Sequence, residues 1–191
     1  SAEPAGAPIV MLASRLLWSK GVGEFVEAAR LVRSELPEVR FVLVGEPDRA
    51  NALAVPVEIL ESWKSDRAVE WWGRRDDMPA VLAQASIVCL PSKYGEGVPK
   101  VLIEAAAAGR PIVTTDTPGC REIVADGENG RLVPPADASA LARACLDLLA
   151  DANTRSAMGR AGRARFVADY SIGSVVASTM SVYDSLESGA A

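Results

Sequence analysis

Two glutamates, Glu96 and Glu104, lie eight positions apart in the stretch YGEGVPKVLIEAAAAG at residues 94–109. This stretch predicts a glycine-rich turn that runs into a short apolar helix. The first backbone N–H groups of a helix have no intrahelical partner and the helix dipole is positive there, so the turn could bind a phosphate. Gly97 lets the backbone approach a ligand, and Pro99 suits the first helical position, where its missing N–H costs nothing. Because a phosphate alone would prefer cations, the two carboxylates indicate a ligand that also carries hydroxyl groups.

The composition is that of an ordinary globular domain with an acidic surface. The chain has 191 residues, enough for one domain with a full core, and contains 49% hydrophobic and 24% charged residues. Lys and Arg number 20 against 25 Asp and Glu, a formal charge of −5, which argues against nucleic acid or an anionic membrane as the main partner. The three cysteines form no CxxC pair, so we interpret them as reduced thiols rather than as a disulfide framework or a zinc site. The absence of histidine removes the commonest general base.

Short apolar runs of strand length alternate with helical patterns as far as Pro134. Residues 9–13, IVMLA, are an unbroken apolar run that is too short for a helix and indicates a buried strand. Six strands separated by helices imply parallel order with right-handed crossovers. We therefore expect an α/β fold with a doubly wound, six-stranded, Rossmann-like sheet that has helices on both faces. The predicted strands are residues 9–13, 40–45, 69–72, 87–90, 111–115 and 130–133, and the predicted helices between them are residues 23–36, 51–65, 76–85 and 119–125 and the helix that starts at Pro99.

After Pro134 and Pro135 the pattern changes to helices alone. Residues 138–150, 153–169 and 172–186 all carry apolar stripes at helical spacing. These C-terminal helices are expected to pack on the sheet and to complete a single domain over residues 1–191. No uninterrupted apolar run reaches the ~18 residues of a membrane span.

Several chemically suggestive residues follow the predicted strands, on loops that meet at the carboxyl edge of the sheet. Ligands of open parallel sheets bind at this edge, near the point where the strand order reverses. We therefore expect a single ligand-binding site at this edge that contains cations, a helix N-terminus and carboxylates. In strand order the candidates are Arg15 and Lys20, then Glu46, then Gly73, Arg74 and Arg75, then Tyr94, Glu96 and Gly97, and finally Asp116 and Thr117.

Each of these residues also has an explanation that involves no function. Arg15 and Lys20 could be solvated surface charges, which is the better interpretation if each is taken alone. Arg74 and Arg75 are expected to face solvent unless a base stacks on one of them. Glu104 could be an exposed helix residue, but the apolar segments VLI and AAAA enclose it, so its carboxylate should need a partner.

Several motifs, taken in order, resemble the retaining glycosyltransferases of family 4, also called group 1, which have the two-domain GT-B fold. Residues 96–104, EGVPKVLIE, resemble the Glu-x7-Glu signature of that family. The segments RLLWSKG at residues 15–21, GRPIVTTDTPGCREIV at residues 109–124 and DGENGRLVPPAD at residues 126–137 extend the resemblance over nearly the whole chain. The bacterial members that build surface polysaccharides are the most similar, although many of those have arginine where this chain has Gly95.

The resemblance implies roles for these residues around a nucleotide-sugar donor. Arg15 and Lys20 match the pair that neutralises the donor diphosphate. Glu104 matches the glutamate that accepts hydrogen bonds from the ribose hydroxyls, and Glu96 matches the one that touches the transferred sugar near the reacting carbon, which makes it the predicted catalytic residue. Further contacts are expected from Gly97, Val98, Lys100 and Val101 to the diphosphate, from Gly73, Arg74 and Arg75 to the nucleobase, and from Thr117 to the sugar.

The resemblance also implies that this chain corresponds to the C-terminal, donor-binding half of a GT-B enzyme. The expected partners are a nucleotide-sugar donor, the missing N-terminal domain and a lipid-linked or saccharide acceptor, with no nucleic acid. The isolated domain is expected to be inactive. The helix at residues 172–186 resembles the one that crosses back to the N-terminal half in full-length members, so its apolar face would be exposed. We expect a cytoplasmic protein that could attach peripherally to the inner membrane through the missing domain.

The predicted function is donor binding for the transfer of a hexose from UDP to an acceptor hydroxyl of a bacterial polysaccharide or glycolipid, with retained configuration. No metal or cofactor is expected, because cations are already placed at the diphosphate and no Asp-x-Asp pair lies at this site. Two alternatives remain open: a nucleotide-sugar epimerase of the same fold, or a non-enzymatic nucleotide-binding Rossmann module. The segment GVGEF at residues 21–25 starts like the GxGxxG fingerprint of the second alternative, but Val26 stands where the third glycine belongs.

Overall fold

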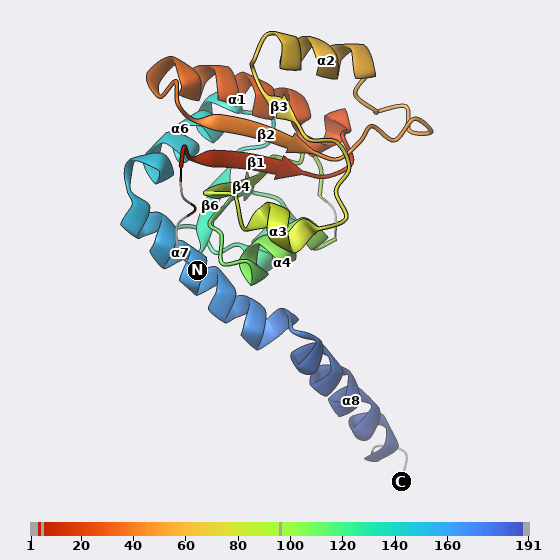
Figure 1. Cartoon of the computed structure of the whole chain (residues 1–191). Helices are drawn as coiled ribbons and strands as arrows, with labels where there is room; N and C mark the ends of the chain where they lie inside the picture. Colours follow the sequence, from red (N-terminus) through yellow and green to blue (C-terminus); the bar gives the residue numbers. More distant parts are fainter. Residues whose placement is uncertain (1–3, 5, 96, 189–191) are drawn as a thin grey trace.

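The computed structural model of the chain, which describes residue 4 and residues 6–95 and 97–188, has a six-stranded parallel sheet at its centre (Figure 1). The strand order is β3-β2-β1-β4-β5-β6, so the direction of winding reverses between β1 and β4. This order confirms the predicted doubly wound α/β fold. The strands are β1 (Ile9–Ala13), β2 (Arg40–Val44), β3 (Glu70–Trp71), β4 (Ile87–Leu90), β5 (Ile112–Thr115) and β6 (Gly130–Val133).

Helices cover both faces of the sheet. The α-helices are α1 (Val22–Glu35), α2 (Val57–Ser65), α3 (Met78–Leu82), α4 (Lys100–Ala107), α5 (Pro118–Ile123), α6 (Ala138–Ala150), α7 (Ala152–Arg165) and α8 (Ile172–Ser188). A single 3-10 turn, η1 (Trp18–Lys20), precedes α1, and a π-helical segment, η2 (Phe166–Tyr170), follows α7. Helices α1, α2 and α6 pack on one face, whereas α3, α4 and α5 pack on the other.

The core lies in two layers, one on each side of the sheet. Alternate residues of β1 point to opposite faces, so Val10 and Leu12 join the layer under α1 and α6, and Met11 joins the layer under α3 and α4. All five β1 residues are buried, because the sheet has no solvent-facing side. The three cysteines are buried and free, and burial raises the pKa of the Cys89 thiol, which lies 3.8 Å from Cys145 Sγ.

Four predicted helix boundaries were wrong, each for a local reason. The helix expected at residues 51–65 begins only at Val57, because residues 51–54 form turns and Pro56 stands at the N-cap. The helix expected at residues 76–85 is five residues long, since Asp77 forms its N-cap and the chain turns after Leu82. Pro99 is the N-cap of α4 rather than its first helical residue. The regular helix predicted at residues 153–169 ends at Arg165 and continues as η2.

The last helical segments differ in how they contact the domain: α7 and η2 are attached to it, whereas α8 extends away from it (Figure 1). Helix α7 and η2 are tied to the domain by side chains that donate to the carbonyl ends of α4 and α5. Arg163 Nη1 lies 2.7 Å from Ala107 O, and Tyr170 Oη lies 2.6 Å from Glu122 O. Helix α8 then extends away from the sheet with its apolar side chains exposed, Ile172 at 85% and Leu186 at 65%. The prediction that all three C-terminal helices pack on the sheet was therefore wrong for α8, whereas the exposed apolar face expected from the family resemblance is present.

Candidate functional site

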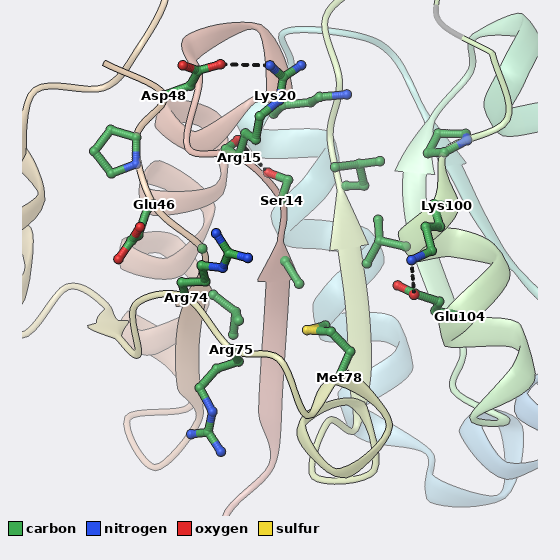
Figure 2. A pocket seen from close by; sticks show the side chains of 17 residues that line it. Ser14, Arg15, Lys20, Glu46, Asp48, Arg74, Arg75, Met78, Lys100 and Glu104 are labelled. Carbon is green, nitrogen blue, oxygen red and sulfur yellow. Dashed lines mark hydrogen bonds and ion pairs between the residues drawn. The ribbon is translucent and has the colours of Figure 1, made fainter. Parts of the chain in front are cut away.

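A cleft of about 670 Å³ opens at the carboxyl edge of the sheet, where β1 lies between β2 and β4 (Figure 2). Its floor is made by the ends of these strands, and its walls are the loops that follow β1, β2 and β3 and the start of α4. This is the switch point of a doubly wound sheet, where ligands bind. The residues that line it are Ala13, Ser14, Arg15, Lys20, Val44, Gly45, Glu46, Pro47, Asp48, Arg74, Arg75, Met78, Leu90, Pro99, Lys100, Val101 and Glu104.

Gly45 brings the loops after the first three strands together at this edge. Its φ of 127° favours glycine, and a Cβ atom there would lie 1.9 Å from Ser14 O. Its N–H donates to Gly73 O at 2.8 Å, and its carbonyl accepts from Trp71 Nε1 at 2.8 Å. The backbone at Gly45 is therefore fixed against both neighbouring loops.

Gly21 plays the corresponding role on the other side of β1. It has a φ of 73° at the N-cap of α1, and a Cβ atom would lie 2.0 Å from Pro91 O in the loop after β4. Lys93 N donates to Ser19 O at 2.9 Å, and Thr115 Oγ1 donates to Ser92 O at 2.7 Å. These contacts hold the loop after β4 between the start of α1 and the end of β5.

The N-terminus of α4 points into the cleft without a side-chain cap. Pro99 has extended backbone angles at the N-cap, and the first turn of the helix carries no acidic residue. The amides of the first turn and the helix dipole therefore favour an anion at this wall. Lys100 in the same turn adds a cation, and its Nζ lies 3.2 Å from Oε1 of Glu104, one turn further along.

Glu104 faces the cleft from α4, and its side chain is 31% exposed (Figure 2). The sequence predicted that this carboxylate should need a partner, and the partner it has is Lys100, whose side chain is 88% exposed. An ion pair between such exposed groups contributes little. The carboxylate therefore remains available to accept hydrogen bonds from a ligand in the cleft.

Two cations from the segment that follows β1 face the same space. Arg15 follows β1, and its Nη1 lies 2.9 Å from Asp48 Oδ2 in the loop after β2. Lys20, from η1, lines the cleft beside it. The cleft thus has Arg15 and Lys20 at one side, and the N-terminus of α4 with the carboxylate of Glu104 at the other.

The loop after β3 closes the cleft with two arginines, each paired with an aspartate two residues along. Arg74 Nε lies 3.4 Å from Asp76 Oδ1, whereas Arg75 and Asp77 form two hydrogen bonds of 2.8 and 2.7 Å. The Arg75 guanidinium holds the pKa of the Asp77 carboxyl below its usual value. Met78 offers an apolar surface next to these arginines.

The structure brings most of the predicted site residues to this one cleft. Arg15, Lys20, Arg74, Arg75, Lys100, Val101 and Glu104 line it. Gly73 lies behind the lining, with its carbonyl bonded to Gly45 N, and Gly97 and Val98 are exposed outside the lining. Thr117 is buried beside the loop after β5, and its hydroxyl has no hydrogen-bond partner. The predicted catalytic residue, Glu96, lies outside the described residues.

Sequence reasoning missed Asp48 and Met78 as lining residues. Asp48 stands in a loop whose course depends on hydrogen bonds to the segment after β1, so no local sequence pattern indicates that it meets Arg15. Met78 was expected only as part of a helix that begins with acidic residues. The signal that could have identified Met78 was its position at the start of a helix, close in sequence to Arg74 and Arg75, which were predicted to contact the base.

Two further findings concern the described part of the chain only. It contains no cluster of three or more His, Cys, Asp or Glu side chains that could hold a metal ion. Within the same residues, no helix combines the length and the apolar character needed to cross a membrane.

The fold and the position of this cleft define the class of protein as a doubly wound α/β domain, and its structural neighbours are of the GT-B type. The crystal structure of HepE from Anabaena in complex with UDP has a TM-score of 0.82 and 25% identity over 96% of this chain and 50% of that chain. The C-terminal domain of LpcC, a glycosyl transferase group 1 family protein from Francisella tularensis, has a TM-score of 0.75 and 25% identity, covering 88% of this chain and 89% of that one.

Sequence comparison gives the family. Residues 7–151 match the family described as glycosyl transferases group 1, and the chain belongs to this family. It is 36% identical over 148 residues to the N,N'-diacetylbacillosaminyl-diphospho-undecaprenol alpha-1,3-N-acetylgalactosaminyltransferase of Campylobacter jejuni, covering 78% of this chain and 37% of that protein. It is 32% identical over 171 residues to the lipopolysaccharide core biosynthesis glycosyltransferase LpsE of Rhizobium meliloti, covering 88% and 47%. The chain thus spans less than half the length of these two curated relatives.

Proposed function

We propose that this chain is the donor-binding domain of a retaining glycosyltransferase that moves a hexose from UDP to an acceptor hydroxyl in the synthesis of a bacterial polysaccharide or glycolipid. The observation that carries the proposal is the composition of the cleft, which brings Arg15 and Lys20 together with the N-terminus and the Glu104 carboxylate of α4. Cations and helix amides suit a diphosphate, and a carboxylate suits the hydroxyl groups of a ribose.

The comparisons support this proposal. HepE, whose structure covers nearly all of this chain, was crystallised with UDP. The curated relatives named above are glycosyltransferases whose names include a lipid-linked acceptor and a lipopolysaccharide core. Membership of the group 1 family favours a transferase over the epimerase of the same fold.

In the proposed reaction the residues of this chain act by binding and by charge compensation. Arg15 and Lys20 would bind the diphosphate and stabilise the negative charge that grows on it as the bond to the sugar breaks. Glu104 would orient the ribose, and the loop of Gly73, Arg74 and Arg75 would contact the base. Glu96 remains the predicted catalytic residue, and Gly97, Val98 and Thr117 remain predicted contacts.

The proposal is tested by titration calorimetry of the chain with UDP, GDP, ADP and NAD. We expect the nucleoside diphosphates to bind more tightly than NAD, because the cleft offers cations for a diphosphate and Glu104 for a ribose, and we expect UDP to bind most tightly, because HepE was crystallised with it. Preference for NAD would contradict the proposal and favour a dinucleotide-binding module.

We also propose that an N-terminal acceptor-binding domain completes the enzyme, since the curated relatives are more than twice as long as the part that matches. The isolated chain should therefore bind nucleotide and transfer no sugar. A radiolabelled UDP-hexose assay with simple saccharide and lipid-linked acceptors measures this, and turnover by the isolated chain would show that the donor domain is sufficient.

A further inference from the structure

Asp48 lines the cleft and forms an ion pair with Arg15, a predicted diphosphate-binding residue. Asp48 Oδ2 lies 2.9 Å from Nη1 of Arg15. In Figure 2 the two side chains point toward one another at the rim of the cleft, on the side away from Lys100 and Glu104. The nucleotide proposed above would therefore bind beside a cation that already has an anionic partner.

The chain holds Asp48 in a fixed place. Its other oxygen, Oδ1, accepts from Ala50 N at 3.3 Å, and its carbonyl accepts from Asn51 N at 2.8 Å. Its side chain is 33% exposed, against 62% for Arg15, so Arg15 is the more solvent-accessible member of the pair. The Asp48 carboxylate thus has a local hydrogen bond besides its contact with Arg15 and is the less exposed of the two groups.

The loop that carries Asp48 is bonded to the segment that carries Arg15. Leu16 N donates to Glu46 O at 2.9 Å, Trp18 N donates to Leu53 O at 2.8 Å, and Val55 N donates to Leu16 O at 3.0 Å. These bonds on both sides of Asp48 attach its loop to the segment of Arg15 and place the carboxylate within reach of the guanidinium.

We propose that Asp48 is a release residue: it competes with the bound nucleoside diphosphate for Arg15 and so weakens the hold of the cleft on the product. This inference rests on the proposed function. The transfer breaks the bond between the anomeric carbon and the β-phosphate oxygen, which keeps the electron pair, and it joins that carbon to the acceptor oxygen, whose proton is released. The product therefore carries one more negative charge than the donor, and without a competitor Arg15 would retain the product more strongly than the donor.

Asp48→Asn tests the proposal, because asparagine keeps an oxygen for Ala50 N and removes only the charge. We expect the variant to bind UDP about fivefold more tightly in calorimetry at low salt, because the guanidinium of Arg15 no longer has to give up an exposed ion pair to contact the phosphates. The gain should fall below about twofold for UMP, which lacks the β-phosphate. Glu27→Gln, which removes an exposed charge from α1 away from the cleft, is the matched control and should leave both affinities unchanged.

A double-mutant cycle shows whether Asp48 acts through Arg15. In an Arg15→Gln background, Asp48→Asn should no longer tighten UDP binding, because the group for which the two anions compete is gone. Unchanged or weaker UDP binding by Asp48→Asn, or a gain that persists in full without Arg15, would overturn the proposal. Failure of the unaltered chain to bind UDP, GDP or ADP would instead overturn the proposed function as well, so the two failures are distinguishable.

Discussion

At the scale of single residues, Gly45 shows how one backbone position shapes the cleft. A Cβ atom at Gly45 would lie 1.9 Å from Ser14 O, so Gly45→Ala must push the loops after β1 and β2 apart. We expect it to lower the free energy of unfolding by about 3 kcal/mol and to abolish nucleotide binding. Gly73→Ala is the matched control: its φ is also positive, but no atom lies within 4 Å of the added Cβ, so the cost should be about 1 kcal/mol. Equal losses in urea unfolding of the two variants would contradict this account.

The sequence identified much of the site at this scale, but not the pairs its residues form. The sequence predicted Arg15, Lys20 and Glu104 as site residues, because these charged side chains lie on a loop and a helix that follow strands of a parallel sheet. Such segments must meet at the carboxyl edge of the sheet. Asp48 was missed because its position depends on hydrogen bonds across the fold that no local pattern encodes. The place of Thr117 was also not predictable, since the loop buries its hydroxyl.

At the scale of elements, the edge strand β3 is attached to β2 by a charged pair. Arg40 Nε and Nη2 donate to the two carboxylate oxygens of Glu70 at 2.6 and 2.7 Å, and this pairing lowers the pKa of Glu70. Because the pKa of Glu70 is lower in the folded chain than in the unfolded chain, the ionised carboxylate stabilises the fold at pH values above the ordinary pKa of glutamate. This stabilisation is lost as the pH falls through the pKa that Glu70 has in the folded chain. Glu70→Gln should therefore cost about 0.5–1 kcal/mol at neutral pH, since the pair is partly exposed, and almost nothing near pH 3. Urea unfolding at both pH values measures the difference, with Glu27→Gln as the control; a cost that is independent of pH would refute it.

The elements themselves were largely predictable. Apolar runs and helical stripes mark buried segments directly, so several elements were predicted with the bounds that the structure has. These elements are Ile9–Ala13, Ile87–Leu90, Gly130–Val133 and Ala138–Ala150. The short helix at Met78–Leu82 was overestimated, because acidic residues that suit a helix start instead pair with arginines in the loop before it.

At the scale of the whole molecule, the domain ends structurally at η2, and α8 extends beyond it. Deleting residues 172–191 removes a helix whose apolar side chains are exposed, so we expect the free energy of unfolding to change by less than about 1 kcal/mol and self-association at high concentration to decrease. Deleting residues 166–191 also removes Phe166 and Tyr170, which pack on the domain, and should cost about 3 kcal/mol or more. Thermal unfolding and light scattering of the two truncated chains make the comparison, and equal destabilisation would show that α8 packs on the domain in solution.

The central claim for the whole molecule is that the cleft binds a nucleoside diphosphate with Glu104 on its ribose. The most direct test is calorimetry of the unaltered chain and Glu104→Gln with UDP and with 2',3'-dideoxy-UDP. Hydrogen bonds to a charged group contribute about 1.5–3 kcal/mol, so Glu104→Gln should weaken UDP binding at least about tenfold and leave dideoxy-UDP binding nearly unchanged. UDP binding that is indifferent to Glu104→Gln, or an equal loss for both nucleotides, would contradict the account.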